Sequence, residues 1–194
     1  PSATHDLPAR RFARPAEPLR LFRGGVIEQP VLAYECWGRP NEARDNTILI
    51  FTGLSPSAHA ASSPGDPRPG WWETMIGEGR PLDTSRFFVV CVNSLGSPFG
   101  ASSPASTDPS TGRTYGIGFP EIAVEDIAVA GRAVIRTLGI ERVAAVVGPS
   151  LGGMVVLAYC AQFPGEVDNL ITISGAASAS PFAIALRSLQ REMV

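Results

Sequence analysis

The sequence is short of histidine, of cysteine and of any dominant charge. Its 194 residues hold only two histidines and three cysteines, and the formal net charge is −2 at pH 7. A balance this close to neutral gives no reason to expect binding to nucleic acid or to an anionic membrane surface. The cysteines form no C-x-x-C pair, so we expect neither a disulfide framework nor a metal site. A reducing compartment, the cytoplasm, fits this cysteine usage.

Long apolar runs are also missing. The longest runs are much shorter than the roughly 18 residues that a membrane-spanning helix needs. The N-terminal segment PSATHDLPARRFARP has basic residues but lacks the apolar stretch of a signal peptide. We therefore expect a protein that does not enter a membrane. A hydrophobic content of 44% with 18% charged residues is typical of a folded globular protein.

Short apolar runs alternate with turn-rich segments along the chain. Five of these runs predict strands, at 31–37, 47–51, 86–93, 142–148 and 170–175. The last four are apolar on both faces, as in the interior of a parallel sheet covered by helices. Helices are predicted over 120–140 and 151–163, and the tail 180–194 begins another amphipathic helix. This order predicts an α/β fold with right-handed crossovers.

The segment Gly148-Pro149-Ser150-Leu151-Gly152 fits the G-x-S-x-G nucleophile elbow, in which a serine occupies a strained strand-to-helix turn. Glycines flank the serine because side chains there would collide with the neighbouring strand and helix. The free N–H groups of the following helix favour negative charge beside the hydroxyl. Ser150 is therefore the candidate nucleophile. The alternative is a glycine-rich turn with an idle serine.

An elbow serine also needs two N–H donors that hold the negative oxygen of the reaction intermediate, the oxyanion hole. The first candidate is the backbone N–H of Leu151, and the second is that of Leu54, in the loop after the strand 47–51. Pro56 in the same loop has no N–H, so we expect it to form a wall of the site. The alternative for this loop is an ordinary turn.

Four segments carry a resemblance to a known family: TGLSPSAH (52–59), GWWETMIGEGRPLDTSRFFVVCVNSLGSPFG (70–100), VVGPSLGGM (146–154) and RSLQRE (187–192). Together they resemble the O-acyltransferases of the homoserine O-acetyltransferase group, with its serine and homoserine O-succinyltransferase and deacetylcephalosporin C acetyltransferase branches. The likeness implies an α/β-hydrolase fold, a mostly parallel sheet with flanking helices. It also implies an N-terminal extension at 1–20, a core at 21–176 and the start of a helical lid at 177–194.

The resemblance implies a ping-pong reaction in cysteine or methionine biosynthesis. Ser150 would take an acyl group from acetyl-CoA or succinyl-CoA, a co-substrate and not a bound cofactor, and pass it to the hydroxyl of an amino acid. Arg191, and with it Arg187, would pair with the carboxylate of that amino acid, unless both are solvated helix residues. Pro56 stands where many homoserine-using relatives have glycine, which favours L-serine over L-homoserine as acceptor. Relatives tend to be homodimers.

A serine nucleophile needs a base, and no histidine follows Ser150. His59 matches a histidine that is not the base in the family, and His5 lies near the N-terminus. Because the triad order in this fold is Ser, Asp, His, Asp168 comes too early to be the acid. We therefore expect residues 1–194 to be the N-terminal part of a longer enzyme, ending before the last strands and most of the lid. The alternatives are a serine esterase that uses water as acceptor and a catalytically incomplete fragment.

Overall fold

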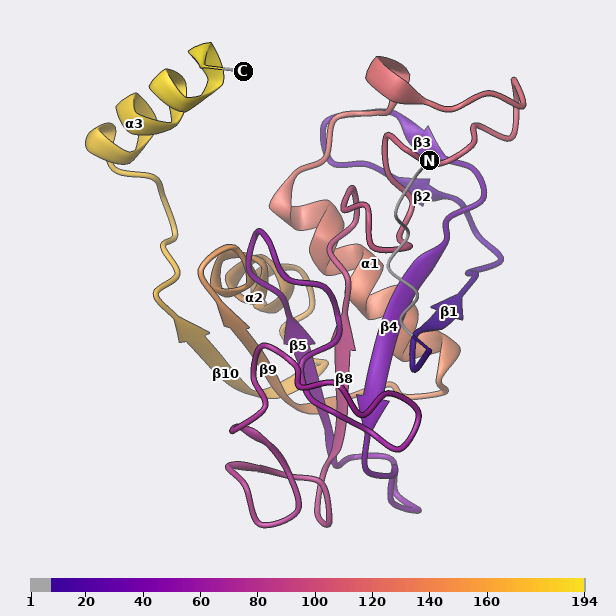
Figure 1. Ribbon diagram of the computed structural model, residues 1–194, viewed down its shortest axis with the longest axis vertical. Helices are drawn as coiled ribbons and strands as arrows, with labels where there is room; N and C mark the ends of the chain where they lie inside the picture. The colour runs from indigo at the N-terminus through magenta and orange to yellow at the C-terminus, as the bar shows by residue number, and fades with distance from the viewer. Residues whose placement is uncertain (1–7, 194) are drawn as a thin grey trace.

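The computed structural model describes residues 8–193, which form a six-stranded sheet with helices (Figure 1). The strands are β1 (Arg11–Ala13), β4 (Leu32–Trp37), β5 (Thr47–Phe51), β8 (Phe88–Val92), β9 (Val143–Pro149) and β10 (Val167–Ile173). Their spatial order is β1-β4-β8-β5-β9-β10. β4 pairs antiparallel with β1 and β8, and the remaining pairs are parallel. This mostly parallel sheet confirms the predicted fold class.

Three α-helices and one 3₁₀ turn accompany the sheet. They are η1 (Gly116–Gly118), α1 (Val124–Thr137), α2 (Leu151–Gln162) and α3 (Pro181–Glu192). α1 begins later than predicted, at a carboxylate cap. Asp126 accepts hydrogen bonds at 2.7 Å from the backbone N–H groups of Ala123 and Phe22, which ties the first turn of α1 to the N-terminal region. Within residues 8–193, none of the helices is long and apolar enough to cross a membrane.

The two faces of the sheet are covered differently. α1 and α2 cover one face, where Val134, Val155 and Tyr159 pack against Phe51 and Val90 in a continuous buried cluster. The other face is covered by the segment 58–82, which we call the covering segment; its Ala58, Ala60 and Ile76 pack against alternate residues of β5, β8 and β9. Short pairs at β2 (Leu19–Arg20) with β3 (Val26–Ile27), and β6 (Ile76–Gly77) with β7 (Leu82–Asp83), complete the strands.

The last strand and helix are the most exposed elements of the described chain. β10 starts three residues before the predicted strand and forms an edge of the sheet, with Leu170, Ile171 and Ile173 each about two-fifths exposed. The predicted strand is present, and its apolar residues are partly exposed because nothing within residues 8–193 covers its outer edge. Its interior position stays a prediction. α3 stands apart from the sheet (Figure 1), and none of its residues is buried.

Candidate active site

Ser150 lies between the end of β9 and the first turn of α2. Its backbone has φ 54° and ψ −117°, a conformation that L-residues rarely adopt, and its N–H donates to the carbonyl of Ile173 on β10 at 2.8 Å. The side chain is exposed and makes no capping hydrogen bond to the helix. The strained turn therefore presents the hydroxyl to solvent at the carboxyl end of the sheet, where ligands bind in open α/β sheets.

The glycines on both sides of Ser150 are required by close packing. A Cβ on Gly148 would overlap the backbone of Gly152, and a Cβ on Gly152 would overlap the carbonyl oxygens of Phe51 and Thr52. The helix α2 can therefore approach β5 only because position 152 has no side chain. This close approach brings the N-terminus of α2 beside the loop that follows β5.

We expect Gly152→Ala to lower the free energy of unfolding by roughly 1–3 kcal/mol, because the added methyl meets backbone atoms that cannot rotate away. Gly165→Ala is the matched control, since a Cβ at that position meets nothing within 4 Å. Urea denaturation of both variants tests the prediction. Equal midpoints for the two variants would contradict the steric role of Gly152.

The two candidate oxyanion donors lie on the two segments that come together here, the loop after β5 and the N-terminus of α2. Leu54 is exposed at 64% in the loop after β5, and within residues 8–193 its N–H donates no backbone hydrogen bond. Leu151 is the first residue of α2, where the N–H groups have no partner inside the helix. Leu54 and Leu151 line one cavity together with Ser150. A hydroxyl and two residues with free N–H groups at one cavity are part of what acyl transfer through a serine requires, the other part being a base.

This cavity has a volume of about 640 Å³ and is closed on one side by α3. Arg187 and Arg191 of α3 line it, as do small residues of the connection from β10. Both arginines make hydrogen bonds within their own helix, to Gln190 at 3.4 Å and to Ser188 at 3.1 Å. The structure thus brings Ser150, both candidate donors and both arginines to one cavity. Their assigned roles stay predictions.

Pro56 is placed differently from the other predicted site residues. Its ring packs over Gly53, where a Cβ would lie 3.8 Å from the Pro56 Cδ atom. The residues that line the cavity beside Ser150 do not include it. An influence of Pro56 on the acceptor would therefore act through the shape of the loop.

A second, mostly apolar cavity of about 670 Å³ lies on the other side of Leu54 and Leu151. Leu95, Phe119 and Ile122 are among its lining residues. The two cavities share Leu54 and Leu151, and Ser150 lines only the cavity that α3 borders.

His59 is buried and unavailable as a base for Ser150. Its Nδ1 faces Glu35 Oε2 and its Nε2 faces the carbonyl of Arg68, each at 2.9 Å. Burial lowers the pKa of His59, but the hydrogen bonds to Glu35 and Arg68 outweigh it and raise the pKa above its usual value. Burial also raises the pKa of Glu35, against the opposing effect of His59. His5 lies outside the described residues.

Glu35 is not among the site residues predicted from the sequence. A charged residue inside the apolar strand 31–37 was the available signal. Asp168 forms a surface ion pair with Arg142, with Arg142 Nε 2.8 Å from its carboxylate, as expected of a residue that is not the catalytic acid. Residues 8–193 therefore hold the candidate nucleophile and its two candidate donors, and His59 is not placed to act as their base.

Comparison with known proteins gives three findings. The profile of the alpha/beta hydrolase fold family matches residues 46–192. A serine O-succinyltransferase from Litchfieldella anticariensis is 56% identical over 96% of this chain and 51% of its own length. An L-serine/homoserine O-acetyltransferase from Streptomyces lavendulae is 53% identical over 96% of this chain and 50% of its own length.

Among solved structures, esterase E22 superposes with a TM-score of 0.84 at 32% identity, over 93% of this chain and 51% of its own. The chain thus spans about half the length of the relatives it matches. The names of these proteins indicate two kinds of reaction: acyl transfer to serine or homoserine, and ester hydrolysis.

Proposed function

Because this chain belongs to the alpha/beta hydrolase fold family, we propose that it is the nucleophile-bearing part of an acyl-CoA-dependent O-acyltransferase whose acceptor is L-serine or L-homoserine. The observation that carries the proposal is the cavity lined by Ser150, by the candidate donors Leu54 and Leu151, and by two arginines. The names of the relatives at 53–56% identity support the same reaction class. Guanidinium groups suit the acceptor because they bind carboxylates through two parallel hydrogen bonds.

The reaction proceeds in two half-reactions. In the first, the Ser150 oxygen attacks the thioester carbonyl, the C–S bond breaks, and CoA leaves as a thiol with the proton taken from Ser150. The N–H groups of Leu54 and Leu151 hold the negative oxygen of the intermediate. In the second, the hydroxyl of the amino acid attacks the acyl-serine, and its proton returns to Ser150. The product is the O-acyl amino acid.

A base must carry these protons, and we infer that it lies outside residues 1–194. His59 has both ring nitrogens engaged, and the sequence has no histidine after Ser150. The matched relatives are about twice as long as this chain, which leaves room for the base and its partner acid. We expect the 194-residue chain by itself to show no turnover, and addition of the missing portion to restore it.

The proposed function is tested by supplying acetyl-CoA or succinyl-CoA to the complete enzyme, with and without L-serine. We expect steady release of CoA only when L-serine or L-homoserine is present, and a ratio of kcat/KM values that identifies the donor. Mass spectrometry should detect the O-acyl amino acid. CoA release that is independent of the amino acid would contradict the transferase function.

The second candidate function is ester hydrolysis with water as acceptor. It is favoured by the close superposition on esterase E22. The two functions share Ser150 and its donors and differ only in the acceptor. Turnover of p-nitrophenyl acetate that no amino acid accelerates would support hydrolysis.

For the transferase function, we favour L-serine as the acceptor. Pro56 stiffens the loop that carries Leu54, and its ring packs on Gly53 at the base of that loop. We expect Pro56→Gly to shift the ratio of kcat/KM toward L-homoserine by about 5- to 150-fold, because one methylene is worth roughly 1–3 kcal/mol in a pocket. An unchanged ratio of kcat/KM would mean that Pro56 does not determine the choice of acceptor.

A further inference from the structure

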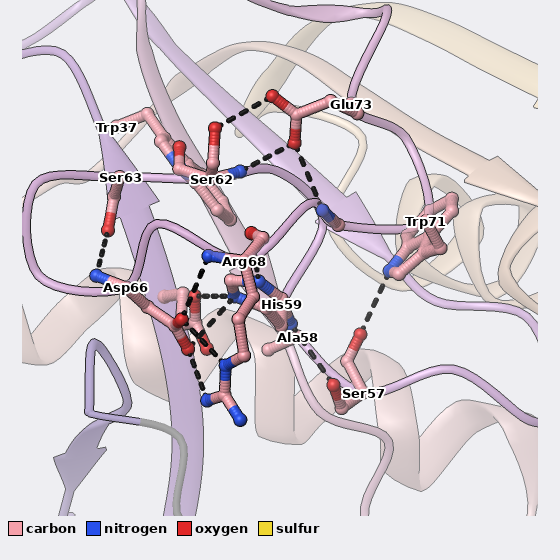
Figure 2. A network of polar contacts seen from close by, with 12 residues as sticks. Trp37, Ser57, Ala58, His59, Ser62, Ser63, Asp66, Arg68, Trp71 and Glu73 are labelled. Carbon is pink, nitrogen blue, oxygen red and sulfur yellow. Dashed lines mark hydrogen bonds and ion pairs between the residues drawn. The ribbon is translucent and has the colours of Figure 1, made fainter.

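His59 joins two separate elements through its ring. Glu35, its partner on Nδ1, lies on β4, and Arg68, whose carbonyl faces Nε2, lies on the covering segment. His59 is 7% exposed and Glu35 is 1% exposed. Figure 2 shows His59 beside the turn that carries Asp66 and Arg68. The ring therefore fastens the covering segment to the sheet beneath it.

The two bonds require a proton between His59 and Glu35. A backbone carbonyl only accepts, so Nε2 carries a hydrogen and donates it to Arg68. The bond between Nδ1 and Glu35 then needs one more hydrogen, on the ring or on the carboxyl group. Asp66 Oδ2 lies 3.8 Å from Nδ1 and adds a second negative charge that favours the protonated ring. The raised pKa values of His59 and Glu35 agree with a proton that stays on the pair.

The carbonyl that receives Nε2–H is itself held in place. Asp66 accepts two hydrogen bonds from the Arg68 guanidinium, at 2.8 Å and 2.6 Å, and one from the Arg68 N–H at 3.2 Å. These bonds from Arg68 lower the pKa of Asp66 to about 2, so the carboxylate stays charged. Backbone bonds between Ser63 and Asp66 close the turn. The Arg68 carbonyl that accepts from Nε2 is therefore held in a fixed position.

His59 also ends the loop that carries the second oxyanion donor. We call residues 52–59 the donor loop. Its first residue, Thr52, contacts Ser94 at 3.2 Å between hydroxyl oxygens, and near its end the Ala58 N–H donates to Asn93. Leu54 lies between these attachments and is exposed, with no backbone hydrogen bond of its own N–H in the described part of the chain. Its position therefore depends on how firmly the ends of the loop are held.

We propose that the buried Glu35–His59 pair is the positioning element of the oxyanion hole, which fixes the end of the donor loop so that the Leu54 N–H points at the reacting oxygen. Neither side chain touches substrate. The proposal rests on the proposed use of Leu54 as a donor. It does not depend on whether the acceptor is an amino acid or water, because both reactions form the same kind of oxyanion.

The test compares Glu35→Gln with the double variant Glu35→Ala/His59→Ala in the complete enzyme. The amide in Glu35→Gln can donate to Nδ1 of a neutral ring, which keeps both bonds of His59. The double variant removes both partners together, so no unpaired buried charge is left to unfold the protein. The measured quantity is the rate constant for acylation of Ser150 in a single turnover, with acetyl-CoA or succinyl-CoA as donor.

We expect the double variant to acylate about 10- to 100-fold more slowly, with an unchanged dissociation constant for the donor, because a displaced N–H loses part of the roughly 10²–10³ in kcat that complete removal of an oxyanion donor costs. Glu35→Gln should stay within about threefold of the original enzyme. A folded double variant with an unchanged rate would overturn the proposal. So would a slow but folded Glu35→Gln, an outcome that can be observed even if the double variant does not fold.

Glu73→Ala is the matched control on the covering segment. Glu73 accepts hydrogen bonds from Ser62 and Gly70 (Figure 2), so its loss loosens the same segment away from the donor loop. We expect lower stability and an unchanged acylation rate, and a rate as slow as that of the double variant would overturn the proposal. If no acyl-CoA acylates the original enzyme, the proposed function fails. The same variants are then compared by the burst of p-nitrophenol from p-nitrophenyl acetate, which decides the positioning role separately.

Discussion

Ser150→Ala in the complete enzyme should abolish acyl transfer, with kcat falling by roughly 10⁵-fold or more, as is typical when a triad nucleophile is removed. The physical reason is that no other hydroxyl occupies the strained turn at the N-terminus of α2, beside the cavity that Leu54 and Leu151 also line. Binding of the substrates should change little, because alanine keeps the backbone and removes a single oxygen atom. Steady-state release of CoA measures the effect.

The covalent step gives an independent readout of the same variant. Incubation of the original enzyme with acyl-CoA and no acceptor should add the mass of one acyl group to the protein, and Ser150→Ala should add none. Ser55→Ala is a suitable control, since Ser55 is an exposed serine next to Leu54 with no assigned role. An acyl adduct that persists in Ser150→Ala would contradict the nucleophile assignment.

The sheet could be predicted from the sequence wherever a strand is buried on both faces. The apolar run 47–51 predicts β5 to the residue, because burial on both sides leaves polar residues only at its ends. β10 was misplaced because its first residues include Asp168 and Asn169, which resemble a turn. In the structure Asp168 pairs with Arg142, and Asn169 donates to the carbonyl of Ala144, so both are accommodated within a paired strand.

The active site could be predicted only where its chemistry is local in sequence. The glycines around Ser150 stand at fixed spacings from it and so leave a recognisable motif, even though Gly152 is required by the distant carbonyls of Phe51 and Thr52. The bond between Glu35 and His59 joins residues 24 positions apart, through packing of an irregular segment on the sheet. No periodic pattern specifies such a contact. The spacing of Arg187 and Arg191 predicts that they share one side of a helix, but their position at the cavity depends on the non-periodic connection 174–180.

Arg191→Ala should raise the KM for the amino acid by about 10- to 100-fold, because a hydrogen bond to a charged group contributes roughly 1.5–3 kcal/mol. The effect should fall on the second half-reaction alone when acetyl-CoA is the donor. Arg191→Lys keeps the charge but not the planar pair of donors, so we expect an intermediate KM. Arg187→Ala, measured in parallel, gives the contribution of Arg187 to the KM for the amino acid.

Arg142→Ala is the control for these variants, because Arg142 pairs with Asp168 on the surface and does not line the cavity. An unchanged KM in both Arg187→Ala and Arg191→Ala would mean that the two arginines are solvated residues of α3 that do not bind the amino acid.

A comparison of the two acyl donors distinguishes two further outcomes, because succinyl-CoA has a carboxylate of its own and acetyl-CoA has none. Slower acylation by succinyl-CoA but not by acetyl-CoA would mean that an arginine binds the acyl group. Normal acylation by both donors, followed by a weakly bound acceptor, would mean that it binds the amino acid.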